Sequence, residues 1–517
     1  MRKFITLDFF IIFFLSILAF IFRFKGLMDS HPFWVDEFST AHQANLLLTN
    51  GLSVFNNHQI HFEIDKFAPT FLVAIFFKLF GQSEGIARLP FAILGAFVPV
   101  SIFFLTKQLF NKHTALVAYL LSTTSYFFIT WSRQARGYVL LQLLVLLGTY
   151  VYLRLIKNPK NKSYFVSLLL IIFVGIFTHP LFYIFLAAVC LHGIFSLMRN
   201  RYYVTIIVSV LAVVSFAIFP KVSSLLNSGG LGLRNNLWYY HSFLWREYGF
   251  IVYLGLLGLL LAFIKQRKNI SFIFLYIFLH LIFINFIFSP VVTRYTLPIF
   301  SFLFIGFAYV ITYLTDHALH DLKIKIPTTY NLSHATILLP LLFTLALIIN
   351  GYKFDIKPNN FYSVNHDFRE IALVDYHQVY NIIKETGSIE ERQTAIIDTW
   401  GDRLNWYMGM NYQPAYFFRW LNSKDLMKGT PFGYNDAGEK IILKRESMRF
   451  IGEVSDLKQA MQTYPRGFIW IDDDTLPADV VSYVKQNFKQ ELYTDHYSLD
   501  DNPYSIWPAT LYSWGIK

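Results

Sequence analysis

The sequence is poor in charged residues and almost without cysteine. Asp, Glu, Lys and Arg make up 15% of the 517 residues, whereas soluble domains carry about 25%. Hydrophobic residues make up 55%. This composition excludes an intrinsically disordered chain and a water-soluble globule of ordinary type. The single cysteine, Cys190, lies in an apolar run, so a disulfide scaffold is excluded as well.

Several motifs that bind cofactors are also missing. The sequence has no Walker loop, no glycine-rich dinucleotide fingerprint after a strand and no His-Glu-x-x-His. Asp472-Asp473-Asp474 has the composition of a metal motif, but it closes an apolar run, which favours a turn at the end of a strand. We therefore expect no nucleotide and no redox cofactor, and leave a divalent metal open.

What the chain has in abundance is long apolar runs. About 20 apolar residues in a helix cross the hydrocarbon core of a bilayer, and such runs recur from the start of the sequence. We predict about eleven spans, near residues 5–22, 89–106, 114–130, 138–153, 164–178, 181–198, 203–219, 248–264, 271–288, 295–314 and 334–350. The first run lacks a small-residue cleavage site, so we expect it to stay in the mature protein.

The distribution of Lys and Arg predicts the orientation. The net charge is +11, and the basic residues gather in every second connection, as in cytoplasmic loops. These connections contain Arg2/Lys3, Lys107/Lys112, Arg154/Lys157/Lys160/Lys162, Arg199/Arg201, Lys265/Arg267/Lys268 and Lys323/Lys325. We expect these side chains to face anionic lipid rather than nucleic acid. The amino terminus is then cytoplasmic, and eleven crossings place the carboxyl terminus outside.

Two outer segments are long, and they set the domain boundaries. Residues 23–88 form a first outer loop with an amphipathic helix near 68–80, inside a membrane domain of residues 1–350. Residues 351–517 form a polar tail, in which short β-type runs alternate with helical patterns. The expected strands are 394–398, 467–471 and 491–493, and the expected helices are 367–385, 455–462 and 478–487. The fold class is therefore a polytopic α-helical membrane protein with a C-terminal extracytoplasmic α/β domain.

The first outer loop opens with two adjacent carboxylates, Asp36 and Glu37, after an aromatic stretch. A carboxylate at the membrane surface can act as a general base toward a lipid-borne substrate. An acidic pair is also typical of a helix amino terminus, where the helix dipole favours negative charge. The local sequence leaves both interpretations open.

A very short outer turn holds two arginines, Arg133 and Arg136, followed by Tyr138. A guanidinium at headgroup depth offers a planar fork of donors to a phosphate. Arginines at this depth can also reach to lipid headgroups without a further role.

Other polar side chains lie at outer span ends. Lys66, beside Asp65, could meet a phosphate, whereas Arg88 is expected to anchor the start of a span. His179 lies at a joint between two spans and is interpreted as a hydrogen-bonded interfacial side chain. The remaining candidates at outer corners are His241, Arg246, Arg294 and Tyr295.

Taken in order, these groups resemble a known family. Asp36-Glu37, Lys66 to Pro69 with Gly81 to Pro90, Ser132 to Tyr138, and Arg294-Tyr295 to Pro298 resemble the membrane glycosyltransferases of the GT-C class. These enzymes take sugar from a polyprenyl-phosphate donor, and the resemblance is to the group of protein O-mannosyltransferases and the lipid A aminoarabinose transferase. It covers roughly residues 1–350.

The resemblance implies a role for each position. Asp36 resembles the catalytic carboxylate that deprotonates the acceptor hydroxyl, and Glu37 its structural or orienting neighbour. Arg136 resembles the arginine that binds the donor phosphate, with Tyr138 close by. Lys66, Arg246, Arg294 and Tyr295 resemble further contacts to the lipid phosphate or the sugar, and Arg133 and His241 are included in this substrate-binding set. Asp65 and His241 resemble residues that hold a metal in aminoarabinose-transferase relatives.

One departure from the family pattern concerns the acceptor. Relatives often have an Asp six residues after the phosphate arginine, where this sequence has Gln142. The missing carboxylate makes the acceptor harder to infer. Residues 1–350 also lack the metal-binding Asp-x-Asp expected in the oligosaccharyltransferase branch.

The expected function is transfer of a sugar from a polyprenyl-phosphate lipid to a hydroxyl acceptor at the outer face of a membrane, with inversion. The expected partners are the donor lipid, the acceptor and the bilayer, without nucleic acid, and a bacterial inner membrane is the default location. The sugar (fucose, mannose, glucose or aminoarabinose) and the acceptor (protein, lipid A or another glycan) stay open. A transporter or flippase is the alternative, but it would place charge near mid-bilayer. A structural membrane protein would give no reason for an outer carboxylate facing several cations.

Overall fold

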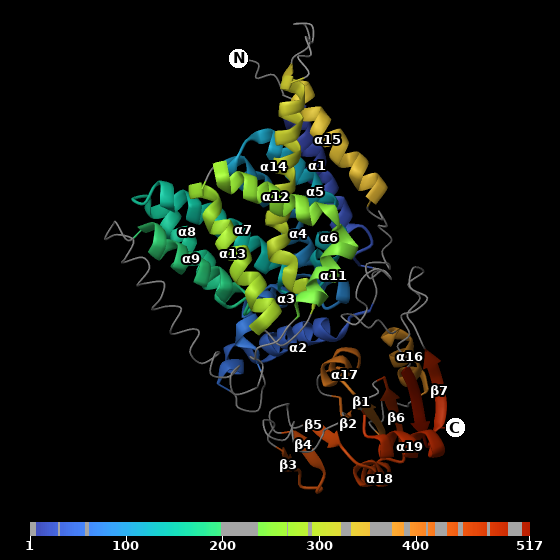
Figure 1. Cartoon of the computed structure of the whole chain (residues 1–517). Helices are drawn as coiled ribbons and strands as arrows, with labels where there is room; N and C mark the ends of the chain where they lie inside the picture. The colour runs from blue at the N-terminus through green and yellow to red at the C-terminus, as the bar shows by residue number, and fades with distance from the viewer. Residues whose placement is uncertain are drawn as a thin grey trace.

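The protein consists of a helical part and a sheet-containing part (Figure 1). The computed structural model describes residues 7–28, 32–56, 62–197, 236–265, 267–287, 292–321, 332–351, 375–386, 393–409, 412–418, 432–442, 448–472, 476–494 and 509–516. The sheet-containing C-terminal domain lies at one end of the helical part, and the start of the chain lies at the other (Figure 1).

The helical part contains helices at the predicted spans that the structure describes and one helix, α11 (Leu237–Tyr248), in a stretch that was predicted to be an outer loop. They are α1 (Leu7–Phe24), α4 (Glu84–Leu109), α5 (Lys112–Thr124), α6 (Tyr126–Ser132), α7 (Tyr138–Lys157), α8 (Lys162–Ile176), α9 (Phe182–Leu197), α11 (Leu237–Tyr248), α12 (Phe250–Lys265), α13 (Arg267–Ile282), α14 (Leu297–Asp321) and α15 (Leu332–Gly351).

Among the described residues, four helices are long and apolar enough to cross a membrane. They cover Glu84–Leu109, Tyr138–Lys157, Ile270–Ile287 and Thr293–His317. The pair Leu237–Trp245 and Phe250–Lys265 passes the same test together, with a bend of 105°, which makes up to five. The predicted number of eleven spans stays a prediction, and the span expected near 203–219 lies outside the described residues.

The run at 114–130, expected as one span, is divided into two helices. Ser125 has an extended backbone (φ −61°, ψ 114°), which ends α5 and begins α6. Its hydroxyl accepts a hydrogen bond from the backbone N–H of Phe128 (3.4 Å) and so caps α6. Serine favours this local bond over a helix interior, which explains the break inside an apolar run.

Glycines allow α12 and α14 to pack closely. A Cβ atom at Gly258 would lie 1.9 Å from the backbone oxygen of Gly306, and one at Gly306 would lie 2.1 Å from the backbone oxygen of Gly255. Such contact between backbones requires small residues, as in other membrane helix pairs. This pair positions α14, which follows the short turn that contains Arg294 and Tyr295.

The first outer loop forms two helices, α2 (Val35–Asn50) and α3 (Phe67–Phe80). Helix α3 confirms the amphipathic helix expected near 68–80. Helix α2 starts after the extended residue Trp34 and ends at Gly51, whose φ of +57° suits glycine. It lies across the lower end of the helical part, between that part and the C-terminal domain (Figure 1).

The C-terminal domain is an α/β unit with an eight-stranded mixed sheet. The strand order is β3-β4-β5-β2-β1-β6-β8-β7, in which β5, β2, β1 and β6 run parallel. The strands are β1 (Thr394–Asp398), β2 (Ala415–Phe418), β3 (Phe432–Tyr434), β4 (Lys440–Ile442), β5 (Met448–Ile451), β6 (Arg466–Ile471), β7 (Lys489–Thr494) and β8 (Ala509–Trp514). The helices are α16 (Tyr376–Thr386), α17 (Gly401–Met408), α18 (Val454–Thr463) and α19 (Ala478–Asn487).

This domain confirms most of the predicted elements. The three expected strands lie within β1, β6 and β7, and the last two expected helices are α18 and α19. Of the helix expected over 367–385, residues 376–385 lie in α16, and residues 367–374 lie outside the described part of the chain.

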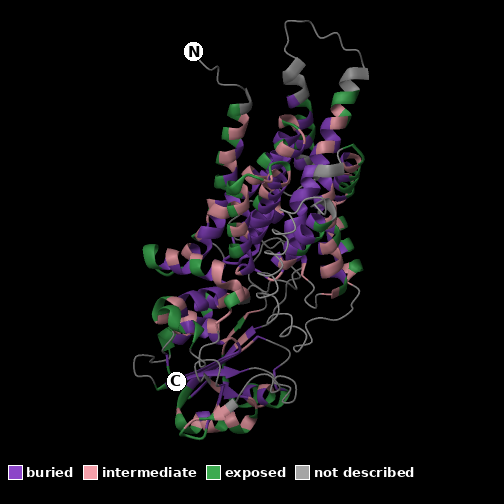
Figure 2. Ribbon diagram, turned by 90° about the vertical axis from the view of Figure 1, so that its left-hand side faces the viewer, coloured by how far each residue is buried: buried purple, intermediate pink, exposed green. Residues whose placement is uncertain are grey.

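The two faces of the sheet bury different cores. Along β1 the side chains alternate: Ala395 and Ile397 pack with Val480 of α19, whereas Ile396 packs with Leu404 of α17. The second face belongs to the same apolar cluster as the helical part. The buried residues accordingly continue from the helices into the sheet (Figure 2). The two parts of the protein are thus joined by a shared core.

Candidate active site

The first turn of α2 places Asp36 between two arginines from distant segments. Its Oδ2 lies 3.2 Å from Nη2 of Arg294 and 3.4 Å from Nη2 of Arg136. Arg136 comes from the turn between α6 and α7, and Arg294 from the 3₁₀ turn Thr293–Thr296 before α14. The Asp36 side chain is 27% exposed, while those of Arg136 and Arg294 are 8% and 10% exposed. The carboxylate therefore reaches solvent between two buried cations.

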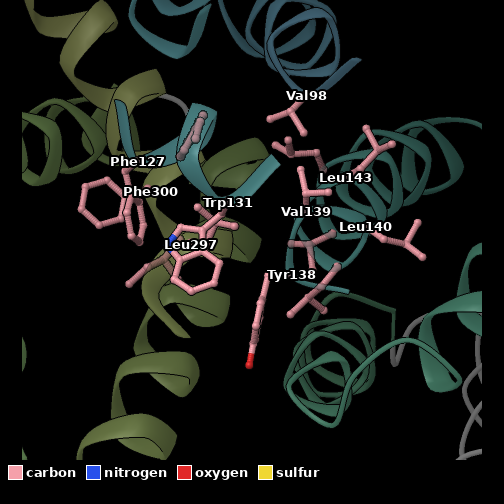
Figure 3. Close-up of a cluster of buried hydrophobic side chains, with 14 of the residues drawn as sticks. Val98, Phe127, Trp131, Tyr138, Val139, Leu140, Leu143, Leu297 and Phe300 are labelled. Carbon is pink, nitrogen blue, oxygen red and sulfur yellow. The ribbon is translucent and has the colours of Figure 1, made fainter. Parts of the chain in front are cut away.

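Arg294 is held by aromatic rings. Its guanidinium carbon lies 5.2 Å from the ring centre of Trp34, 5.5 Å from that of Trp131 and 5.4 Å from that of Tyr138. Its Nε donates a hydrogen bond to the Tyr138 hydroxyl at 2.9 Å. Tyr138 lies at the edge of an apolar cluster and directs its hydroxyl away from it (Figure 3). A cation in such a cage is oriented while its charge stays available.

Arg136 is anchored to α2. Its Nη1 donates to the backbone carbonyl of Asp36 at 3.0 Å and to the Thr40 hydroxyl at 3.2 Å. Its Nε is buried and has no hydrogen-bond partner. A buried donor without a partner is costly, and here it leaves hydrogen-bonding capacity beside Asp36.

The charges around Asp36 control its ionisation. Burial acts to raise the pKa of Asp36, but the charges of Arg136, Arg294 and Lys66 outweigh it and lower that pKa below the ordinary value of 3.8. Burial acts to lower the pKa of Arg136, and Asp36 reverses this effect and raises it. Asp36 is therefore an anion, and Arg136 a cation, at neutral pH.

Glu37, the adjacent carboxylate, is enclosed by hydrogen bonds that connect parts of the fold. It is fully buried, and its two oxygens accept hydrogen bonds from Arg88 at 2.8 and 2.7 Å. The backbone N–H of Ala135 donates to the same carboxylate at 2.8 Å. The pair of Glu37 and Arg88 thus ties α2 to α4 and to the turn that carries Arg136. Arg88, expected as an anchor at a span start, has this more specific partner.

Arg133 binds backbone carbonyls rather than the carboxylate of Asp36. Its Nη1 donates to the carbonyls of Arg23 (3.0 Å) and Lys25 (2.7 Å), and its Nη2 donates to that of Gly26 (3.2 Å). These bonds fix the segment that follows α1. The two arginines of one turn therefore have different surroundings.

Lys66 lies in a short 3₁₀ turn (Ile64–Lys66) and is near the site. Its Nζ is 2.6 Å from Oε2 of Glu63, and its charge acts on Asp36. Asp65, in the same turn, acts electrostatically on Tyr183 of α9. Among the described residues, three or more His, Cys, Asp or Glu side chains nowhere gather to hold a metal ion.

Two further predicted residues, Tyr295 and His241, lie in different places. Tyr295 is buried, with its ring centre 6.2 Å from that of Tyr138 and 5.9 Å from that of His179. His241 is exposed on α11, where it stacks on Trp238 and bonds the Tyr253 hydroxyl at 2.8 Å. The side chain of Arg246 lies outside the part that the structure describes.

Sequence reasoning missed the residues that hold the site together. Trp34 donates through Nε1 to Oε1 of Gln134 (2.8 Å), next to the two cations. His179, interpreted as interfacial, lies 5.0 Å from the Tyr138 ring. One hint of a role for Trp34 was present in the sequence, because Trp34 lies two residues before Asp36. Gln142, at the position of the missing carboxylate, donates to the Ser301 hydroxyl at 2.9 Å within the helical part.

The C-terminal domain rests on the helix that carries Asp36. Phe33 lies 5.0 Å from Trp406 of α17, and Phe38 lies 5.7 Å from Tyr407 (ring centres). The Tyr407 hydroxyl donates to Oε1 of Glu84 at 3.0 Å. These contacts lie on either side of Asp36 in the sequence, so the domain supports the start of α2.

A second buried charge cluster lies inside that domain. Arg403 donates to Asp398 at the end of β1, to Asp472 after β6 (2.7 Å) and to the Thr399 hydroxyl (2.9 Å). Tyr380 donates to Asp398 as well. Asp472 directly follows β6, as its position after an apolar run predicted, whereas Asp473 and Asp474 lie outside the described residues, so the predicted turn stays a prediction.

Comparisons with known proteins concern the family and the fold. Residues 67–223 match the family described as dolichyl-phosphate-mannose-protein mannosyltransferase. No curated protein sequence matches the chain. Among solved structures, ArnT from Cupriavidus metallidurans in the apo state has a TM-score of 0.61 at 13% identity, and each chain is covered to 97%. The same protein bound to undecaprenyl phosphate has a TM-score of 0.60 at 11% identity, again with 97% of each chain covered.

An archaeal enzyme gives a third match. The oligosaccharyltransferase AglB from Archaeoglobus fulgidus, in complex with an inhibitory peptide and a dolichol-phosphate, has a TM-score of 0.57 at 11% identity. The match covers 89% of this chain and 69% of that chain. At these identities the likeness concerns the fold, which is the GT-C fold that the sequence resemblance implied.

Proposed function

We propose that this GT-C glycosyltransferase, an enzyme with a lipid-linked donor, moves a sugar from a polyprenyl phosphate to a hydroxyl acceptor with Asp36 as the general base. The observation that carries the proposal is the contact of one partly exposed carboxylate with two buried arginines (3.2 and 3.4 Å). The relatives bound to undecaprenyl phosphate and dolichol-phosphate support the class of donor.

Arg136 and Arg294 bind the donor phosphate in this mechanism. Guanidinium groups suit phosphate because they donate two parallel hydrogen bonds. The unpartnered Nε of Arg136 supplies one further donor. As the bond between the anomeric carbon and the phosphate oxygen breaks, negative charge grows on that oxygen, and fixed cations stabilise it. Lys66 adds a third positive charge.

Asp36 accepts the proton of the acceptor hydroxyl as that oxygen attacks the anomeric carbon. The new carbon–oxygen bond forms on the face opposite the phosphate, so the configuration inverts. The proton ends on Asp36, the electron pair of the broken bond leaves with the polyprenyl phosphate, and no metal is required for this balance.

Donor binding and base strength are linked in this site. In the free enzyme Arg136 and Arg294 lower the pKa of Asp36, which makes it a weak base. A donor phosphate that takes their hydrogen bonds reduces this effect, and the pKa of Asp36 rises toward a more useful value. Asp36 is thus activated when the donor is in place.

Location and orientation belong to the same proposal. A cytoplasmic amino terminus, as the Lys and Arg distribution predicts, places α2, the arginines and the C-terminal domain on the outer side of the membrane. A bacterial inner membrane, with the sugar donor delivered on its outer leaflet, fits this arrangement.

Arg136→Ala tests the proposal. In proteoliposomes supplied with polyprenyl-phosphate sugars, the variant should lose roughly 10²–10³ in kcat/KM for the donor, because one charged phosphate contact is removed. The acceptor KM should change little. The matched control is Arg154→Ala, at the other end of α7, where Arg154 bonds Gln108, and it should keep wild-type transfer.

Two outcomes would contradict the proposal. An equal loss for donor and acceptor would assign Arg136 a role in folding. Movement of the lipid across the bilayer without any sugar transfer by the wild-type protein would indicate a flippase.

A further inference from the structure

We infer that Glu63 is a charge-selecting residue beside the phosphate site: it admits a singly charged phosphodiester and disfavours the more highly charged phosphomonoester that remains after transfer. The inference rests on the proposed function, because it assumes that a polyprenyl phosphate binds near Arg136. It adds a residue whose task is discrimination between donor and product.

Glu63 lies where a phosphate contact is expected. Its Oε2 is 2.6 Å from Nζ of Lys66, and both side chains are about three-quarters buried, with 27% and 28% exposed. Its charge also acts on Arg136. One carboxylate thus faces two of the three cations of the site.

The position of Glu63 is fixed by the scaffold. Its backbone N–H donates to Oε1 of Gln43 at 3.1 Å, and its carbonyl accepts from the N–H of Lys66 at 3.0 Å. Gln43 follows Asp36 and Thr40 at helical spacing, so these three side chains lie on one face of α2. The turn that holds Glu63 is therefore attached to the helix that holds the base.

The charges of the site favour a phosphodiester over a phosphomonoester. Arg136, Arg294 and Lys66 are cations, and Asp36 and Glu63 are carboxylates, joined by ion pairs or electrostatic coupling. These five groups together carry one positive unit, which matches a phosphodiester with its one negative charge. A phosphomonoester carries about 1.5 to 2 negative charges near pH 7. Its negative charge therefore exceeds the positive charge of these groups. Without Glu63 the site would carry two positive units and would match the product.

The reaction itself creates the difference that Glu63 detects. Transfer breaks the ester between sugar and phosphate, and the leaving phosphate gains the negative charge. Repulsion from Glu63 then acts on the product more strongly than on the donor, which speeds release of the product. If Glu63 did no more than pair with Lys66, it would add little to stability and would not discriminate between the donor and the product.

Glu63→Gln tests the inference in the full-length protein. The probes are undecaprenyl phosphate, a monoester, and its methyl phosphodiester, and equilibrium binding to each is measured at pH 7.5. The variant should bind the monoester about tenfold more tightly, and the diester no more than about threefold, because a single charge at close range is removed. Glu63→Asp should restore the wild-type ratio, and Asp479→Asn, on the exposed side of α19, should leave it unchanged.

A second readout separates selection from a structural effect. At pH 5 the monoester is largely singly charged, since its second pKa is about 6, so the gain of Glu63→Gln should shrink to that of the diester. Equal tightening of both lipids, or no change for either, would overturn the inference and leave the proposed function intact. Failure of the wild-type protein to bind either lipid would overturn both.

Discussion

The protein contains two clusters in which arginines meet carboxylates, and they differ in what they leave available. The Asp36 centre (Asp36, Lys66, Arg136, Tyr138 and Arg294) has contacts of 3.2 and 3.4 Å, a carboxylate that is 27% exposed and a buried Arg136 Nε without a partner. The Arg403 centre (Tyr380, Asp398, Thr399, Arg403 and Asp472) joins side chains that are 1 to 7% exposed where they form ion pairs.

The difference shows how the same residue types serve two purposes. In the Arg403 centre, one guanidinium bonds two carboxylates and a hydroxyl, so its hydrogen-bonding capacity is used within the domain. Such a network stabilises one arrangement of strands and helices. In the Asp36 centre two arginines meet one carboxylate, and the surplus positive charge can bind an anion.

Breaking the Arg403 centre should have the larger effect on stability. Arg403→Met leaves Asp398 and Asp472 buried without their cation, and we expect a loss of about 3–5 kcal/mol in the free energy of unfolding of the C-terminal domain. Chemical denaturation of the purified protein, followed by tryptophan fluorescence, measures this loss. Lys485→Met, which removes an exposed cation of α19, should change stability little.

The sugar-transfer activity of Arg403→Met tests whether the Arg403 centre and the Asp36 centre act independently. Molecules of Arg403→Met that stay folded should keep the donor KM of the wild-type enzyme, because Arg403 bonds Asp398, Asp472 and Thr399, which lie outside the Asp36 centre. A change of the donor KM without a loss of stability would show that the two centres are not separate.

The contact between the two regions should respond to pH with a smaller effect. His377 of α16 lies 3.1 Å from Glu84 of α4, and the hydrogen bond to Glu84 raises the pKa of His377 above its ordinary value of 6.5. A raised pKa means that the stabilisation is complete below pH 6.5 and is lost as the pH rises through the pKa of the folded state.

His377→Gln should therefore lower the Tm at pH 5.5 and leave it close to wild type above pH 8.5. The difference should correspond to less than about 1 kcal/mol, because His377 is half-exposed and solvent screens the pair. Thermal unfolding of both proteins across this pH range measures the effect. A Tm difference that stays constant, or that grows with pH, would contradict the assigned pair.

Much of the architecture could be predicted because it depends on local patterns. Short apolar β-type runs indicated β1, β6 and β7, and helical patterns indicated α3, α18 and α19. The break at Ser125 was not predicted, since the stretch Ser122-Thr-Thr-Ser125 inside an otherwise apolar run is compatible with a continuous helix. Packing decides between the two.

The structure brings several of the predicted site residues together, but the sequence did not show how each of them is paired. Asp36 and Glu37 are adjacent, and the sequence alone does not say which of them is exposed. Their partners, Arg294 and Arg88, come from 258 and 51 residues away in the chain. Only the fold shows that Arg88 encloses Glu37 while Arg294 leaves Asp36 accessible. Arg133 and Arg136 are three residues apart, and again only the fold shows that Arg133 bonds backbone carbonyls while Arg136 contacts Asp36.

The most direct test of the central claim is the turnover of Asp36→Asn. Asparagine keeps the size of the side chain and removes the base, so we predict normal insertion and unfolding behaviour with a loss of sugar transfer of at least about 10³-fold, since general base catalysis contributes 10²–10⁴-fold. The measurement is transfer from polyprenyl-phosphate sugars in proteoliposomes, with Asp479→Asn as the control. Wild-type turnover in Asp36→Asn would contradict the account.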